Sequence, residues 1–197
     1  MKQLLLDIKP AAPPTLRNFV VGRNAEALAS LKNISANHFI YLWGEKGCGK
    51  THLLSACEAH GIRVADDVHL LNNDAQIALF NTYNQLKDKG EILIAAGLHA
   101  PTQMGLRDDI ATRLAWGLVY QLQPLNDAEK ALALQNHAKE LGIKLPDEVI
   151  DYCLRYLRRD LPTLMATLDA LDEWSLTAHK PVTVPMLKKL LQLDLGL

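Results

Sequence analysis

One loop constrains the fold of this chain more than any other feature. Residues 44–51 read GEKGCGKT and match the pattern GxxxxGK followed by Ser or Thr at every fixed position. The apolar run 39–43 before the loop is of strand type, and residues 53–57 after it read as a helix. Strand, glycine-rich loop and helix in this order predict a phosphate-binding loop, in which backbone N–H groups and the helix N-terminus face phosphate oxygens.

The side chains of the loop have separate roles in that prediction. We expect Lys50 to reach the outer phosphates and the hydroxyl of Thr51 to ligate Mg²⁺. His52, the next residue, is better explained by packing on the helix than by catalysis. The expected nucleotide contacts on this segment are Gly44, Glu45, Lys46, Gly47, Cys48, Gly49, Lys50, Thr51 and His52.

A pair of acids lies in the next apolar segment. Residues 62–71 are expected to form a second buried strand, which carries Asp66 and Asp67. Because ligands collect at the carboxyl ends of parallel strands, Asp66 would hold Mg²⁺ through water. Asp67 would orient or activate the attacking water. The alternative is that the two acids only cap a helix or a turn.

Strands and helices alternate in the first part of the chain, which predicts an α/β fold with a parallel sheet. The four expected strands lie at residues 39–43, 62–71, 91–96 and 117–122. Beyond Pro124 only helices are expected, beginning near Asn126, Pro146, Asp160 and Thr183. Asn126 with Glu129 three residues later is the capping-box arrangement. We therefore divide the chain into a tail with a proline-rich linker (1–14), an α/β nucleotide-binding subdomain (15–124) and a helical subdomain (125–197).

Composition argues against several classes of function. The net charge of −1 supplies no global basic field, so strong direct binding to DNA is not expected. No apolar run approaches the roughly 18 residues of a membrane span. The three cysteines, Cys48, Cys57 and Cys153, are widely spaced and form no disulfide framework, which suits a reducing cytoplasm.

Arg113 is an isolated cation in the expected helix 106–114. A lone arginine in a helix is usually a solvated charge. Its functional interpretation is an arginine finger, which is a cation offered to the γ-phosphate of a neighbouring subunit. Spacing along the sequence leaves both interpretations open.

Together these segments resemble the AAA+ family, and within it the nucleotide-binding part of the bacterial replication initiator DnaA. Residues 19–24 (FVVGRN) are similar to a segment that contacts adenine in the family, which implies that role for Val20 and Val21. Residues 44–51 match Walker A, residues 65–69 match Walker B, and residues 109–117 look like the segment with the arginine finger, here Arg113, and a following Trp-Gly.

This resemblance spans roughly residues 16–195 and implies a AAA+ phosphate-loop domain with a C-terminal helical lid, which binds ADP or ATP with Mg²⁺. The sheet would be a reduced one of four strands. Only a few residues separate the helix after the loop from the strand of Asp66, where the family places another strand and helix. The resemblance stops before the DNA-binding domain of a full initiator.

The N-terminal residues resemble the clamp-binding peptide of regulators in this family. Gln3 would form a hydrogen bond in a polar pocket of the sliding clamp, the β subunit of DNA polymerase III. Leu4, Leu6 and Ile8 would fill an apolar groove beside that pocket. The proline-rich segment 9–14 would let the body swing relative to the clamp.

Such regulators inactivate the initiator after replication has started, and the resemblance implies the same activity here. The clamp loaded on DNA would recruit the protein, and Arg113 would promote hydrolysis of the ATP bound to DnaA. The protein would be cytoplasmic, nucleoid-associated through the clamp and able to associate with copies of itself. Its own ATPase would be weak or absent.

Two further departures from the family pattern point away from a vigorous ATPase. The strand at 91–96 ends without the polar sensor residue that the family places there. The lid arginine that touches nucleotide in the family falls at Pro162, and Arg158 or Arg159 are the candidates to replace it.

Two other functions stay open at this stage. The first is a self-sufficient ATPase of the helicase-loader type, which also resembles DnaA. The second is a plain DNA-binding adaptor, which the net charge of −1 disfavours.

The tail generates a direct prediction. Replacement of Gln3 and Leu4 by alanine together should abolish binding to the sliding clamp, because both the polar and the apolar contact of the peptide are removed. Surface plasmon resonance with immobilised clamp measures this, and clamp binding by the double variant equal to that of the wild type would contradict it.

Overall fold

The computed structural model describes residues 13–34 and 39–194 of the chain. These residues form two compact units, Pro13–Leu125 and residues 126–194, which are described separately below. Gln3, Leu4, Leu6 and Ile8, the expected clamp-binding residues, lie outside the described residues.

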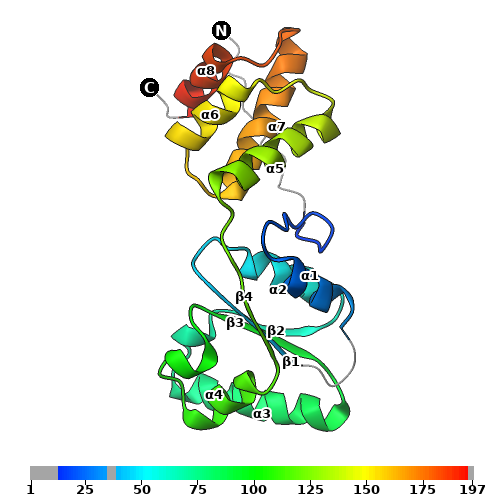
Figure 1. The fold of residues 1–197 in the computed structure, drawn as a ribbon, viewed down its shortest axis with the longest axis vertical. Coiled ribbons are helices and arrows are strands. Elements are labelled where there is room, and N and C mark those ends of the chain that lie inside the picture. The colour runs from blue at the N-terminus through cyan, green and yellow to red at the C-terminus, as the bar shows by residue number, and fades with distance from the viewer. Residues whose placement is uncertain (1–12, 35–38, 195–197) are drawn as a thin grey trace. The chain divides into compact units, whose positions relative to one another are not determined.

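The first unit is built on a four-stranded parallel sheet with the order β2-β3-β1-β4 (Figure 1). Its strands are β1 (Phe39–Trp43), β2 (Arg63–Ala65), β3 (Leu93–Gly97) and β4 (Leu118–Gln121). The two central strands, β1 and β3, are apolar because both of their faces are covered. The predicted reduced parallel sheet is confirmed.

Helices cover both faces of this sheet, as Figure 1 shows. The helices are α1 (Ala25–Lys32), α2 (Lys50–Glu58), α3 (Asn73–Lys89) and α4 (Asp108–Ala115). Alternate residues of β1 point to opposite faces. Ile40 and Leu42 pack with α1 and α2, whereas Tyr41 packs with α3 and α4. The single turns η1 (Val68–Leu70) and η2 (Pro101–Gln103) follow β2 and β3.

The second strand is shorter than its sequence predicts. A strand was expected over 62–71, but β2 ends at Ala65 and the chain turns into η1. Asp67 has φ 47°, in the left-handed region, and its N–H donates to Oδ1 of Asp66 at 2.8 Å. The left-handed residue ends the extended backbone here. Val68 is therefore buried from a turn, whereas Leu70 is 73% exposed.

The second unit consists of four helices around an apolar core. They are α5 (Asp127–Leu141), α6 (Asp147–Tyr156), α7 (Leu161–Ala178) and α8 (Val184–Asp194). The side chain of Asn126 accepts from Glu129 N–H and the Glu129 carboxylate accepts from Asn126 N–H, so the predicted capping box is confirmed. Asp160 caps α7, whose first turn accommodates Pro162.

The core of the second unit is almost entirely aliphatic. Its fully or nearly fully buried members are Leu134, Ala138, Val149, Ile150, Cys153, Leu154, Leu164, Leu168, Leu171, Val182, Leu187 and Leu190. None of the helices in the described part of the chain has both the length and the apolar composition that crossing a bilayer requires.

Truncation of this core should be costly. Leu164 is completely buried, so Leu164→Ala should lower the free energy of unfolding by about 2–5 kcal/mol through lost burial and a residual cavity. Leu176, which is 65% exposed, is the matched control, and Leu176→Ala should change the value by under about 0.5 kcal/mol. Denaturant titration followed by circular dichroism compares the two. Equal midpoints would contradict the packing described here.

Candidate nucleotide-binding site

The phosphate loop connects the carboxyl end of β1 to the first residue of α2. Gly49 immediately precedes α2 and has φ 99°, which side chains rarely adopt. A Cβ at this position would lie 2.6 Å from Cε2 of Phe19, which is buried in the core. Glycine therefore lets the segment 19–24 pack directly against the loop.

Lys50 is the buried cation of the loop, with 8% of its surface exposed. Its Nζ donates to the carbonyl oxygens of Gly44 at 2.7 Å and Glu45 at 3.0 Å and lies 3.7 Å from Sγ of Cys48. No described carboxylate forms an ion pair with this ammonium. Two carbonyl dipoles compensate a buried charge only in part, so the arrangement suits a phosphate anion as the further partner.

Thr51 and Asp66 come together from different elements. The Thr51 hydroxyl donates to Oδ2 of Asp66 at 2.7 Å, which joins the start of α2 to the residue after β2. A hydroxyl and a carboxylate oxygen are the hard ligands that Mg²⁺ accepts, with phosphate and water completing its shell. The described residues hold no cluster of three or more His, Cys, Asp or Glu side chains that could bind a metal by itself. These two residues fit a Mg²⁺ ion that arrives with a nucleotide.

Asp67 lies apart from this pair. Its side chain is 59% exposed, and its Oδ1 lies 4.0 Å from Nδ1 of His69. The Nδ1 atom of His69 is buried and has no hydrogen-bond partner among the described residues. The left-handed backbone of Asp67 turns its carboxylate toward the η1 turn, whereas Asp66 faces Thr51.

The segment before α1 is joined to the end of the sheet by hydrogen bonds between residues that lie about 100 positions apart in the sequence. The side chain of Asn24 donates to the carbonyl of Gln123 at 2.9 Å and accepts from its N–H at 2.7 Å. Arg23 donates to the carbonyl of Pro124 at 2.7 Å. Val20 and Val21 are half-buried beside these residues. In the sequence Asn24 closes the segment 19–24, and nothing in that local pattern indicates its partner at residue 123.

His52 contacts the same N-terminal segment. Its Nε2 lies 3.0 Å from the carbonyl oxygen of Thr15, and its ring lies 5.5 Å from that of Phe19. These contacts support the packing explanation for His52. Glu45, Lys46 and Gly47 form the exposed turn of the loop.

Arg113 lies in the last turn of α4 against three aromatic rings. Its Cζ is 4.6 Å from the ring centroid of Trp116 and 5.8 Å from those of Phe80 and Tyr83. Burial raises the pKa of Tyr83, and the charge of Arg113 opposes that rise. No acidic side chain in the described residues pairs with Arg113, so its guanidinium is held by cation–π contacts and keeps its charge available.

Aromatic contacts identify the end of the sheet at which Arg113 lies. Tyr83 stacks on Phe39, the first residue of β1, with ring centroids 4.0 Å apart. Gly117 passes so close to the Phe39 backbone that a Cβ would overlap its carbonyl oxygen. The phosphate loop begins after Trp43, the last residue of β1. Arg113 and the loop therefore occupy opposite ends of the same central strand.

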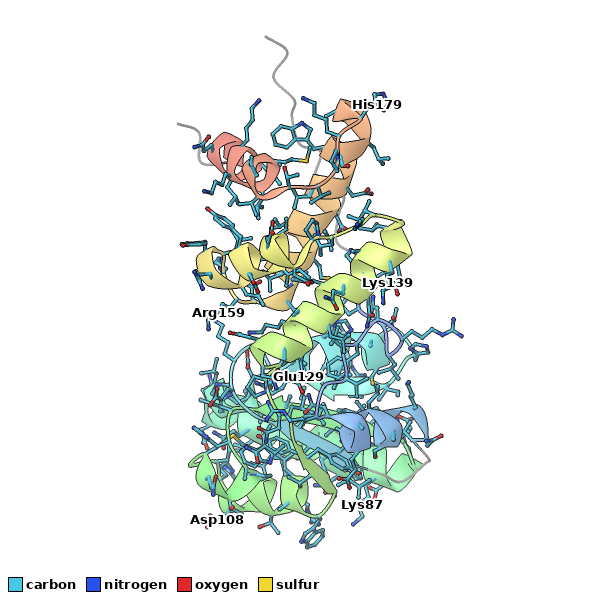
Figure 2. All side chains as sticks on the ribbon, turned by 45° about the horizontal axis from the view of Figure 1, so that its top comes forward. Lys87, Asp108, Glu129, Lys139, Arg159 and His179 are labelled. Atoms are coloured by element: carbon cyan, nitrogen blue, oxygen red, sulfur yellow. The ribbon has the colours of Figure 1, made fainter. Side chains whose placement is uncertain are left out.

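A second cation, Lys87 of α3, lies 5.8 Å from the ring of Trp116 and is labelled in Figure 2. Trp116 is 64% exposed, and Leu118 and Val119 of the edge strand β4 are also exposed. Cations and apolar side chains thus share this surface.

The two arginines that were expected as candidates for a nucleotide contact from the lid lie near the start of α7. Arg158 lies 3.3 Å from Asp160, and Arg159 lies 3.7 Å from Asp127. Both arginine side chains are exposed, so these ion pairs are weak.

Two cysteines are structural. Burial raises the pKa of the Cys57 and Cys153 thiols to about 11, so both stay protonated and unreactive at neutral pH.

Comparison with known proteins places this geometry in a class. Residues 127–191 match the family model described as Hda, lid domain. Domain III of the replication initiation protein DnaA from Thermotoga maritima has a TM-score of 0.70 at 23% identity, over 93% of this chain and 98% of that chain. A replication initiator DnaA bound to AMPPCP and single-stranded DNA has a TM-score of 0.65 at 24% identity, over 84% of this chain and 68% of that chain. RuvB of Thermotoga maritima, a Holliday junction branch migration motor, has a TM-score of 0.59 at 12% identity, over 82% of this chain and 63% of that chain.

The class is therefore a AAA+ fold of the DnaA type with a C-terminal helical lid, as the sequence predicted. Within that class, the sequence resembles Hda, the DnaA-homologous regulator. The lid segment 127–191 therefore matches the Hda lid family, and the fold of the chain is that of the DnaA nucleotide-binding domain.

The loop geometry generates a binding prediction. Lys50→Ala should abolish the rise in melting temperature that ADP with Mg²⁺ produces, because the cation facing the phosphates is lost. Lys139→Ala, an exposed lysine of α5, is the control and should keep the full rise. Differential scanning fluorimetry measures both, and ADP stabilisation of the Lys50 variant equal to that of the wild type would mean that the loop is not the site.

Proposed function

We propose that this chain is a regulatory AAA+ protein that binds ADP or ATP with Mg²⁺ and inactivates the replication initiator DnaA. Together with the DNA-loaded sliding clamp, it promotes hydrolysis of the ATP bound to DnaA. The observation that carries this proposal is the position of Arg113 at the end of β1 opposite the phosphate loop.

Nucleotide binding is supported by the loop itself. Lys50 is buried without a described carboxylate partner, and Thr51 and Asp66 present oxygens to one point. A DnaA of the same fold binds the nucleotide analogue AMPPCP. Bound Mg²⁺ would neutralise charge on the phosphates, while Lys50 and the loop N–H groups would hold their oxygens. Val20 and Val21 would contact the adenine.

Geometry supports action on a partner's nucleotide. A strand of five residues separates the loop from the aromatic contacts of Arg113, and each residue advances about 3.3 Å. Arg113 therefore cannot reach a phosphate in its own loop. Its charge, unpaired among the described residues, suits an arginine finger in trans. The stacking on Trp116 would limit the side-chain freedom lost on binding.

Weak hydrolysis by the protein itself is supported by two features of the described site. Strand β3 runs Leu93–Gly97 and ends without a polar side chain that could contact the γ-phosphate. Asp67, the candidate to activate water, faces His69 and is mostly exposed. The bound nucleotide would then be structural or regulatory.

The remaining parts of the proposal concern partners and location. Gln3, Leu4, Leu6 and Ile8 would bind the sliding clamp, so a cytoplasmic protein would become nucleoid-associated through it. Residues 1–14, 15–124 and 125–197 would act as tail, nucleotide-binding subdomain and lid. Association with copies of the chain would use the same surfaces, and strong direct binding to duplex DNA is not expected at a net charge of −1.

Substitution of Arg113 tests the proposal. Arg113→Ala should lower the stimulated ATPase of DnaA to the level seen without this protein, because an arginine finger contributes about 10³–10⁵-fold to hydrolysis. Steady-state ATPase with DnaA, clamp and DNA measures this. The variant should keep its ADP stabilisation, which separates loss of the finger from loss of folding.

Arg63→Ala, an exposed arginine on the far edge strand β2, is the control and should stimulate normally. Normal stimulation by Arg113→Ala would contradict the finger. Rapid ATP turnover by this protein in the absence of DnaA, raised by DNA or helicase, would favour the helicase-loader function instead.

A further inference from the structure

The lid carries two neighbouring tyrosines, of which Tyr152 packs against the edge of the core and Tyr156 lies outside it. Val149, Ile150, Cys153 and Leu154 form the buried face of α6. Tyr152 is half-buried, and Tyr156 at the end of the helix is 63% exposed. A tyrosine left this exposed adds little to the stability of the lid, because most of its ring remains in water.

The two rings lie together one helical turn apart. Their centroids are 4.5 Å apart with an angle of 36° between the ring planes. Nζ of Lys188, from α8, lies 5.4 Å from the centroid of Tyr152. Helix α8 lies beside α6, as Figure 1 shows, so the lysine comes from a separate part of the chain.

Cations alternate with these rings. Arg155 lies three residues after Tyr152 and beside Tyr156, which places all three on one side of α6. Arg158 follows in the connection to α7, and its side chain is 85% exposed. We call the surface of Tyr152, Arg155, Tyr156, Arg158 and Lys188 the lid aromatic-basic face.

Acids border this face without neutralising it completely. Asp160 contacts Arg158 at 3.3 Å, and Asp151 lies one turn before Arg155 without an ion pair to it among the described residues. Arg159, labelled in Figure 2, is held toward Asp127 of α5 and is not counted in the face. Exposed ion pairs contribute little, so an arriving phosphate can replace the Asp160 carboxylate.

We propose that the lid aromatic-basic face binds single-stranded nucleic acid. Unpaired bases present flat faces that stack on tyrosine rings and arginine planes, and the flanking phosphates meet the cations. Packing against the core accounts for Tyr152, and the helix dipole accounts for cations near the end of α6. Neither accounts for the mostly exposed ring of Tyr156 beside them. An acidic peptide would satisfy the cations and leave the rings without partners.

This site is independent of the phosphate loop and of Arg113, so it does not rest on the proposed function. It is also compatible with the net charge of −1, because a local cluster of three cations gives weak and salt-sensitive binding. Duplex DNA hides its base faces in the stack and should bind less well.

Fluorescence anisotropy with a labelled oligo-dT tests the proposal on the full chain. The wild type should bind, with a slope of log K against log salt of about −2 from three phosphate contacts. Tyr156→Ala should weaken binding about tenfold, and Tyr156→Phe should bind like the wild type. Arg155→Ala should reduce the magnitude of the salt slope by about 0.7.

Leu176→Ala removes an equally exposed side chain elsewhere on the lid and is the matched control, which should bind like the wild type. Circular dichroism of every variant checks that the fold is kept. Three results would overturn the proposal: no binding of oligo-dT at low salt, equal binding by the wild type and Tyr156→Ala, or equal affinity for a duplex. Binding of a polyglutamate peptide that depends on Tyr156, without binding of oligo-dT, would also overturn it and assign the face to an acidic protein segment.

Discussion

The burial of β1 between β3 and β4 is the constraint on which the first unit depends. Five apolar residues, Phe39–Trp43, pair with a parallel neighbour on each side and supply side chains to the cores on both faces. A strand in this position holds both of its ends in place. The carboxyl end starts the phosphate loop, and the ring of Phe39 at the amino end supports Tyr83, which lies beneath Arg113.

Two chemically different surfaces result from this one strand. The loop end offers N–H groups and a buried lysine, which suit phosphate, and a hydroxyl–carboxylate pair, which suits Mg²⁺. The other end offers a guanidinium on aromatic rings, which suits a phosphate carried by another molecule. The length of the strand separates the two ends. Arg113 therefore cannot contact a nucleotide bound to the phosphate loop of its own chain. The regulatory function that we propose depends on this separation.

The lid is stabilised by different interactions. Its helices depend on an aliphatic core and on local caps at Asn126 and Asp160. The stability of the lid therefore depends little on the side chains of its outer surface. Pro162 occupies the first turn of α7, where a helix tolerates proline. Tyr156 and the exposed cations near the end of α6 have no part in the core, and for that reason they can bind a ligand without cost to the fold.

The sequence by itself determined the features that depend on near neighbours along the chain. The glycine spacing of residues 44–51, the alternation of strands and helices, and the capping box at Asn126 each act within a few residues, so they could be predicted. Only the tertiary structure decided the features that join distant segments. These are the early end of β2 at a left-handed Asp67, the pairing of Asn24 with Gln123 and the aromatic support of Arg113. Such contacts depend on which strands become neighbours and in which register, and that is settled by packing of the whole sheet rather than by any local pattern.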